Sequence, residues 1–139
     1  MSIVMPPKWM SITMVLAGCY NLAWGSWAVF FPTHSFEYSG LQKLGKPLDY
    51  PQLWQCIGMI VGVYGVGYLA SARNPIRHWP VILVGFLGKC FGPMGYVYGV
   101  SRGETEPGTI VTNIFNDLIW LPAFAIILLR AYQLRNRID

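Results

Sequence analysis

Four apolar stretches dominate the chain, and their length limits what it can fold into. An α-helix of roughly 20 residues crosses the hydrocarbon core of a bilayer, which is about 30 Å thick. With 54% hydrophobic and only 12% charged residues, the 139-residue chain is far more apolar than an ordinary soluble domain. We therefore predict one all-α integral-membrane domain over residues 1–139, a transmembrane four-helix bundle. The predicted helices are residues 11–31, 53–72, 79–98 and 110–132.

Lysine and arginine residues are unevenly divided between the two sides of the predicted bundle. Cytoplasmic connections of membrane proteins carry an excess of these residues. Six lie on the side that holds both chain ends, against three on the opposite side, so we expect both termini in the cytoplasm. This asymmetry accounts for most of the net charge of +4, and we predict no nucleic-acid partner. The six are Lys8, Arg73, Arg77, Arg130, Arg135 and Arg137, and the three are Lys43, Lys46 and Arg102.

The longest connection, residues 32–52, lies on the side opposite the chain ends. Its apolar residues favour a segment that lies on the membrane surface or folds over the mouth of the bundle. These residues are Phe36, Tyr38, Leu41 and Leu44.

Two ionisable residues lie deep inside the apolar stretches, where charges are rare and usually functional. Lys89 is ten residues, or roughly 15 Å, from the cytoplasmic end of the third predicted helix. Asp117 is seven residues, or roughly 10 Å, from the outer end of the fourth. In a core of about 30 Å the two α-carbons then differ in depth by about one helical turn, which a lysine side chain spans. We therefore expect a buried ion pair.

Small and polar residues follow the helical period in all four stretches. A glycine stripe in a membrane helix is where another backbone approaches, so Lys89 should face protein rather than lipid. Pro93 and Pro122 lack an amide hydrogen, which should leave the carbonyls of Lys89 and Leu118 as free acceptors. The faces are Met14, Ala17, Gly18, Asn21, Gly25 and Ala28; Gln55, Gly58, Gly62 and Gly65; Gly85, Gly88, Lys89, Gly92, Gly95, Tyr96 and Gly99; and Asn113, Asn116, Asp117 and Trp120.

We predict that these faces meet at a buried ligand site. Apolar walls with a few convergent polar groups suit the polar head of a lipid or a quinone. The expected function is that of a binding or accessory protein. His34 and His78 lie on opposite sides of the membrane, so we predict no metal site. The predicted ligand-binding residues are Asn21, Trp24, Gln55, Lys89, Tyr96, Asn116, Asp117 and Trp120.

Three alternatives use the same two charged residues. The Lys89–Asp117 pair can simply hold helices together in a structural subunit of a larger membrane complex. It can also exchange a proton in a small proton-coupled transporter, which would work as a homo-oligomer because the chain is short. An enzyme with either residue as acid or base is the least expected, since no nucleophile and base accompany them.

Several segments together resemble the DoxX-like group of small four-helix bacterial membrane proteins, whose members are often labelled alkyl hydroperoxide reductase. This resemblance implies a four-helix fold in the bacterial inner membrane. It also implies an association with membrane redox or lipid chemistry, because DoxX-type proteins are known as subunits of thiosulfate and quinone oxidation. The segments are Tyr20–Gly25, Trp54–Met59, His78–Pro80, Gly88–Lys89 with Gly92–Pro93, and Asn116–Trp120.

The peroxide-reducing activity in that label requires an accessible thiolate of low pKa and a resolving partner. Cys19, Cys56 and Cys90 all fall inside predicted helices, with no CxxC motif, as is typical of small packing residues. We therefore expect the fold of that group and not the reductase activity.

Overall fold

The computed structural model describes residues 5–41, 45 and 47–135, and these residues form helices and no β-strand. The predictions on Lys43, Leu44, Lys46 and Arg137, and on the side chain of Arg135, lie outside the described part. The elements are α1 (Lys8–Phe30), α2 (Pro32–Tyr38), α3 (Pro51–Ser71), α4 (Trp79–Ser101), the 3₁₀ helix η2 (Pro107–Thr109), α5 (Ile110–Asn113), the π-helix η3 (Ile114–Leu118) and α6 (Leu121–Arg135).

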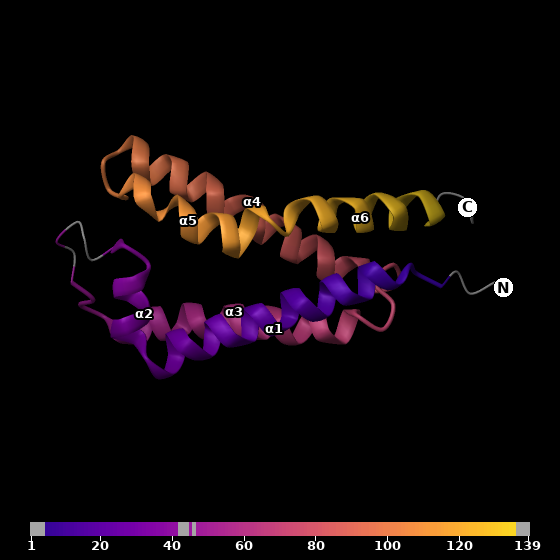
Figure 1. Cartoon of the computed structure of the whole chain (residues 1–139), viewed down its shortest axis with the longest axis horizontal. Coiled ribbons are helices and arrows are strands. Elements are labelled where there is room, and N and C mark those ends of the chain that lie inside the picture. Colours follow the sequence, from indigo (N-terminus) through magenta and orange to yellow (C-terminus); the bar gives the residue numbers. More distant parts are fainter. Residues whose placement is uncertain (1–4, 42–44, 46, 136–139) are drawn as a thin grey trace.

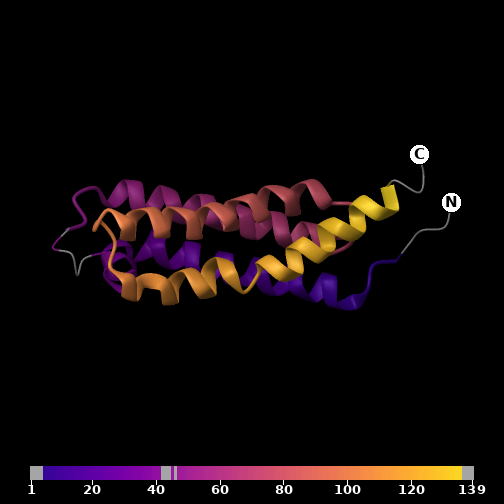
Figure 2. The ribbon, with the colours of Figure 1, turned by 90° about the horizontal axis from the view of Figure 1, so that it is seen from above.

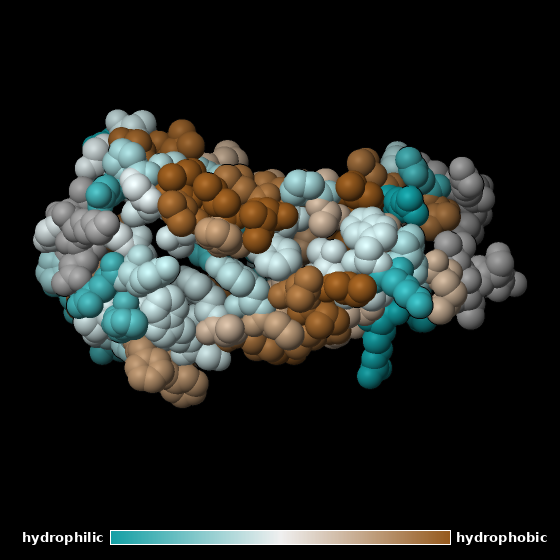
Figure 3. Space-filling model, viewed as in Figure 1, coloured by the Kyte–Doolittle hydropathy of each residue, from teal (hydrophilic) through white to brown (hydrophobic). Residues whose placement is uncertain are grey.

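Among the described residues, three helical runs are long and apolar enough to cross a membrane: α3, α4 and the run Pro107–Leu134. α1 passes the same test only together with α2, from which it is bent by 119°. The chain is therefore an all-α membrane protein with three such helices, or four if the bent pair is one span. Apolar residues cover much of the middle of the surface, while hydrophilic residues gather toward its ends (Figure 3). The predicted ends of the first three helices agree with α1, α3 and α4 to within three residues.

The long helices run alternately in opposite directions and form two layers (Figures 1 and 2). α1 and α3 lie side by side in the first layer, with α2 at one end, and α4 lies with α5 and α6 in the second. The first and last described residues lie at the same end of the molecule. We call this the terminal end, and the opposite one the α2 end.

Glycine residues bring the backbones of α1 and α3 into contact. A Cβ atom on Gly25 would lie 2.5 Å from the Gly58 carbonyl oxygen, and one on Gly65 would lie 2.8 Å from the Gly18 carbonyl oxygen. Because no side chain fits at these distances, the first layer is packed as a glycine-mediated helix pair. The small face predicted for the first helix is buried in full, namely Met14, Ala17, Gly18, Asn21, Gly25 and Ala28.

An apolar core joins the two layers at the terminal end. Its largest member, Tyr68, is only 1% exposed and meets Phe124 edge to face, with 5.2 Å between the ring centroids. The core residues of α1, α3 and α4 come from the parts of these helices nearest the terminal end, and α6 as a whole lies in that half of the molecule, so the two layers are held together there. The core consists of Met10, Met14, Ala17, Tyr68, Ile82, Phe124 and Ile127.

The long connection after α1 folds back onto the first layer rather than away from it. The Trp54 indole Nε1 donates a hydrogen bond of 2.8 Å to Ser35 Oγ, and the Phe36 and Trp54 rings lie 5.3 Å apart. The Tyr38 ring packs at a tilt against the Trp27 ring, with 5.2 Å between their centroids. α2 therefore covers the α2 end of α1 and α3.

Candidate functional site

The last helical run, predicted as a helix over residues 110–132 with a carbonyl freed by Pro122, is one candidate span, Pro107–Leu134, but its regular α-helix is broken in the middle. The Ile119 amide donates to the Ile114 carbonyl five residues back, and the Trp120 amide donates to the Asp117 carbonyl three residues back, both at 3.1 Å. Pro122, which has no amide hydrogen, lies in the first turn of α6, where a proline is tolerated. π-Helical turns of this kind are frequent at functional sites.

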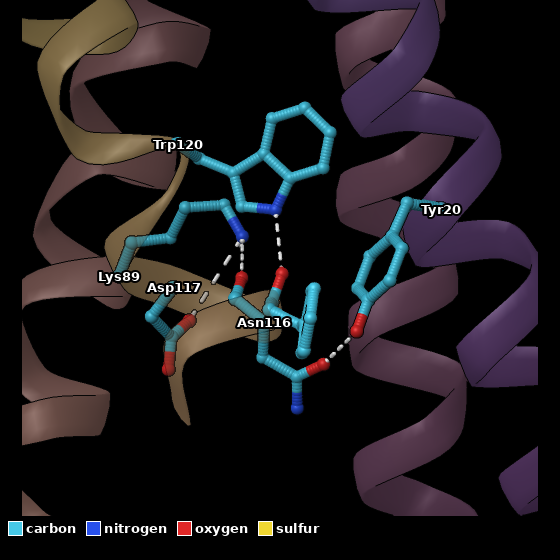
Figure 4. Close-up of polar contacts among 6 residues, drawn as sticks. Tyr20, Lys89, Asn116, Asp117 and Trp120 are labelled. Carbon is cyan, nitrogen blue, oxygen red and sulfur yellow. Dashed lines mark hydrogen bonds and ion pairs between the residues drawn. The ribbon is translucent and has the colours of Figure 1, made fainter. Parts of the chain in front are cut away.

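The break removes the regular amide donors from two backbone carbonyls. In a continuous α-helix, the Phe115 and Asn116 carbonyls would accept from the next amides four residues on, which here donate elsewhere. Instead, the Phe115 carbonyl accepts from the Trp120 indole Nε1 at 2.9 Å, and the Asn116 carbonyl accepts from Lys89 Nζ at 2.5 Å (Figure 4). An unpaired buried carbonyl costs about 1–3 kcal/mol, so these side-chain donors stabilise the broken turn.

Lys89 is almost fully buried, with 5% of its surface exposed. Its Nζ atom lies 3.9 Å from Asp117 Oδ1 and 5.9 Å from the centroid of the Trp120 ring. The depth calculation placed the two α-carbons about one helical turn apart, a difference that the lysine side chain spans to reach this distance. The carbonyl beside the amine is that of Asn116, whereas we expected the one freed by Pro93, through which α4 continues.

Tyr20 connects the first layer to the broken turn of the second. Its hydroxyl donates a hydrogen bond to Asn116 Oδ1, and its ring lies 5.8 Å from that of Trp120 (Figure 4). Asn116 thus accepts from Lys89 through its backbone and from Tyr20 through its side chain. A contact that joins both layers lies directly beside the buried amine.

A cleft of about 430 Å³ lies between the layers, next to the Tyr20–Asn116 contact, and we call it the first cleft. Polar groups are few and meet apolar and aromatic walls. The lining residues are Tyr20, Asn21 and Trp24 of α1, Ile57, Ile60, Val61, Tyr64 and Tyr68 of α3, Gly85, Gly88, Lys89 and Gly92 of α4, and Asn116 and Asp117 of η3.

Asn21 is one of the polar side chains of the first cleft that lack a hydrogen-bond partner within the described part of the chain. It is 6% exposed, and no side-chain hydrogen bond to it is found among the described residues. Its amide offers both a donor and an acceptor to whatever fills the cleft. The Asp117 side chain, 19% exposed, offers a carboxylate.

The glycines of α4 divide into two sets. A Cβ atom on Gly92 would overlap the Asp117 carboxylate, and one on Gly85 would overlap the Tyr68 hydroxyl. At Gly88 and Gly95, by contrast, no atom lies within 4 Å of such a Cβ. The expectation that this stripe packs against another backbone is therefore wrong, because side chains meet Gly85 and Gly92 and nothing meets Gly88 or Gly95, and Gly88 instead keeps the first cleft open.

A second cleft of about 490 Å³ lies toward α2, and among the described residues no charged side chain lines it. It shares Tyr20, Trp24 and Asn116 with the first, so the Tyr20–Asn116 contact stands between the two. Its other lining residues are Ala23, Trp27, Ser35, Tyr38, Ser39, Val111, Thr112 and Phe115.

Most of the predicted site residues come together, but two lie elsewhere. Gln55 Nε2 donates to the Val29 carbonyl at 2.8 Å, and the Tyr96 hydroxyl donates to the Pro107 carbonyl at 2.7 Å. Both side chains tie neighbouring segments together and do not line the first cleft. Trp120 contacts the site from its edge, and the residues that line the cleft are Asn21, Trp24, Lys89, Asn116 and Asp117.

Sequence reasoning did not single out Tyr68 or the two backbone carbonyls of the broken turn. Tyr68 follows Tyr64 by four residues on the face of α3, a spacing that indicates a shared helix face. No residue type marks a backbone carbonyl, so the Phe115 and Asn116 acceptors could not be predicted. Cys19 and Cys56 are exposed rather than packed inside.

These features define a helical membrane protein with a polar cleft between two helix layers. No protein-family model, curated protein or solved structure significantly matches the chain. Within the described part, no group of three or more His, Cys, Asp or Glu side chains is placed to bind a metal ion.

Proposed function

We propose that this is an integral-membrane binding or accessory protein that holds the polar head of a lipid- or quinone-like molecule in the first cleft. The observation that carries the proposal is the unpartnered Asn21 amide beside Lys89 and Asp117 in an otherwise apolar cleft. Ligand pockets typically combine apolar walls with a few placed polar groups. The head would lie at these groups and the tail along the apolar wall.

In this proposal the chain spans the bilayer four times, with both termini in the cytoplasm of a bacterial inner membrane. Lys8, Arg73 and Arg130 belong to the terminal end and Arg102 to the α2 end, which supports this orientation through the excess of positive charge. The resemblance to the DoxX-like group supports a link with membrane redox chemistry.

In the proposal, Lys89 and Asp117 form an ion pair and make a part of the cleft wall that has no net charge. A pair with 3.9 Å between Nζ and Oδ1 is less costly to bury than either charge alone. A purely structural pair would do the same, so the function has to be tested through the ligand.

Native mass spectrometry of the purified protein tests the proposal, with Lys89→Met as the variant and Lys8→Met as its matched control on the exposed start of α1. We expect wild type and Lys8→Met to carry a lipid-like mass that Lys89→Met loses while it stays helical by circular dichroism. A Lys89→Met protein that keeps the bound mass, or a wild type that carries none, would contradict the proposal.

A further inference from the structure

The charge of Lys89 is already matched by groups of the protein. Its ammonium donates to the Asn116 carbonyl at 2.5 Å, faces Asp117 at 3.9 Å and lies near the Trp120 ring. The side chain is only 6% exposed. A negatively charged head group in the first cleft would therefore approach the Asp117 carboxylate without a free cation to offset the repulsion, at an effective dielectric constant well below that of water.

The groups left to bind a ligand are neutral or acceptor-only. The Asn21 residue has only 6% of its surface exposed, and its side-chain amide has no hydrogen-bond partner in the described part of the chain. It can donate one hydrogen bond and accept another, whereas the carboxylate of Asp117 can only accept. A hydroxyl group both donates and accepts, and so it complements the two residues together.

The α3 wall of the first cleft is apolar and open. Ile57 and Ile60 line the cleft and are 45% and 58% exposed on α3, a helix long and apolar enough to cross a membrane, so in a bilayer the cleft would meet lipid there. At Gly88 the α4 wall leaves open space where a side chain would otherwise stand. A lipid can therefore place its head inside while its acyl chain stays among the lipids of the bilayer.

We propose that the first cleft selects membrane lipids with an uncharged, hydroxyl-bearing head and rejects heads that carry a phosphate. The hydroxyl would donate to Asp117 and accept from Asn21. This inference rests on the proposed function, since it names the chemical class of ligand for the same site.

Two lipids that differ only by a phosphate separate the two proposals: 1-oleoylglycerol and 1-oleoyl-lysophosphatidic acid. Each is titrated into the purified full-length protein in detergent, and the bound fraction is measured by native mass spectrometry. We expect 1-oleoylglycerol to bind at least tenfold more tightly. Tighter or equal binding of the phosphate lipid, or binding of neither lipid, would overturn the inference and leave the proposed function standing, because that function is tested by the mass that co-purifies with the protein.

Two variants locate the selectivity in the cleft. Asn21→Leu should lower the affinity for 1-oleoylglycerol at least tenfold. Asn113→Leu should leave this affinity unchanged, because the Asn113 side chain lies outside the first cleft. The near-isosteric Asp117→Asn removes the repelling charge, so it should raise the affinity for the phosphate lipid and abolish or reverse the preference. Binding of 1-oleoylglycerol that is unchanged in both Asn21→Leu and Asp117→Asn would place it elsewhere and overturn the inference.

Discussion

At the scale of single residues, the site depends on where side chains are missing as much as on where they are present. Gly92 leaves room for the Asp117 carboxylate, and Gly88 leaves room for the first cleft. Both are on the same helix as Lys89, so α4 supplies the amine and the space around it. The glycines of α4 are therefore not equivalent.

Gly92→Ala tests this difference. The added methyl group overlaps the Asp117 carboxylate and must displace it, so we expect a loss of about 1–3 kcal/mol in the free energy of unfolding. Thermal unfolding in detergent measures it. Gly95→Ala is the control on the same helix, because its Cβ meets open space and alanine favours a helix by roughly 0.5–1 kcal/mol. Equal stability of the two variants would contradict the claim that Gly92 and Gly95 differ in the space around them.

At the scale of helices, the broken turn between α5 and α6 determines the geometry of the site. It points the Asn116 side chain toward Tyr20 and its carbonyl toward Lys89 (Figure 4). A continuous helix would use that carbonyl for its own hydrogen bond and leave the lysine without this acceptor. The break in the helix therefore brings the polar residues of this run into contact with Lys89 and Tyr20.

Trp120→Phe tests how much the indole contributes to the broken turn. The change keeps an aromatic ring, although a smaller one, and removes the N–H donor to the Phe115 carbonyl. We therefore expect the free energy of unfolding to fall by about 1–3 kcal/mol, measured by chemical unfolding in detergent. Trp9→Phe, on the exposed start of α1, is the matched control and should be close to neutral. A Trp120→Phe protein as stable as this control would mean that the carbonyl is satisfied in another way.

Much of the arrangement of the helices could be predicted from the sequence, and the features that could not be predicted have physical explanations. The small face of α1 was predictable because helical period and residue size decide which side can be buried. That the Lys89 side chain can reach Asp117, about one helical turn away in depth, followed from helix rise and membrane thickness alone. Gln55 and Tyr96 share helix faces with site residues, yet their polar atoms reach backbone carbonyls of neighbouring segments, a choice that spacing does not reveal.

At the scale of the whole molecule, two helix layers are joined at the terminal end by the apolar core and meet again at Tyr20–Asn116. The clefts lie on the two sides of this second contact. Such an arrangement, embedded in lipid, presents a polar centre to molecules that already reside in the bilayer. That is the central claim of the proposed function, and it concerns where a lipid goes rather than how stable the helices are.

Site-specific photo-crosslinking tests this claim most directly. A photoreactive amino acid replaces Ile60 at the mouth of the first cleft or Val63, which is 70% exposed on the same helix but outside the cleft. After irradiation in native membranes, mass spectrometry of the adducts should show one dominant lipid-like species at position 60 and the mixed bulk lipids at position 63. The same bulk mixture at both positions would contradict the claim that the cleft holds a specific ligand.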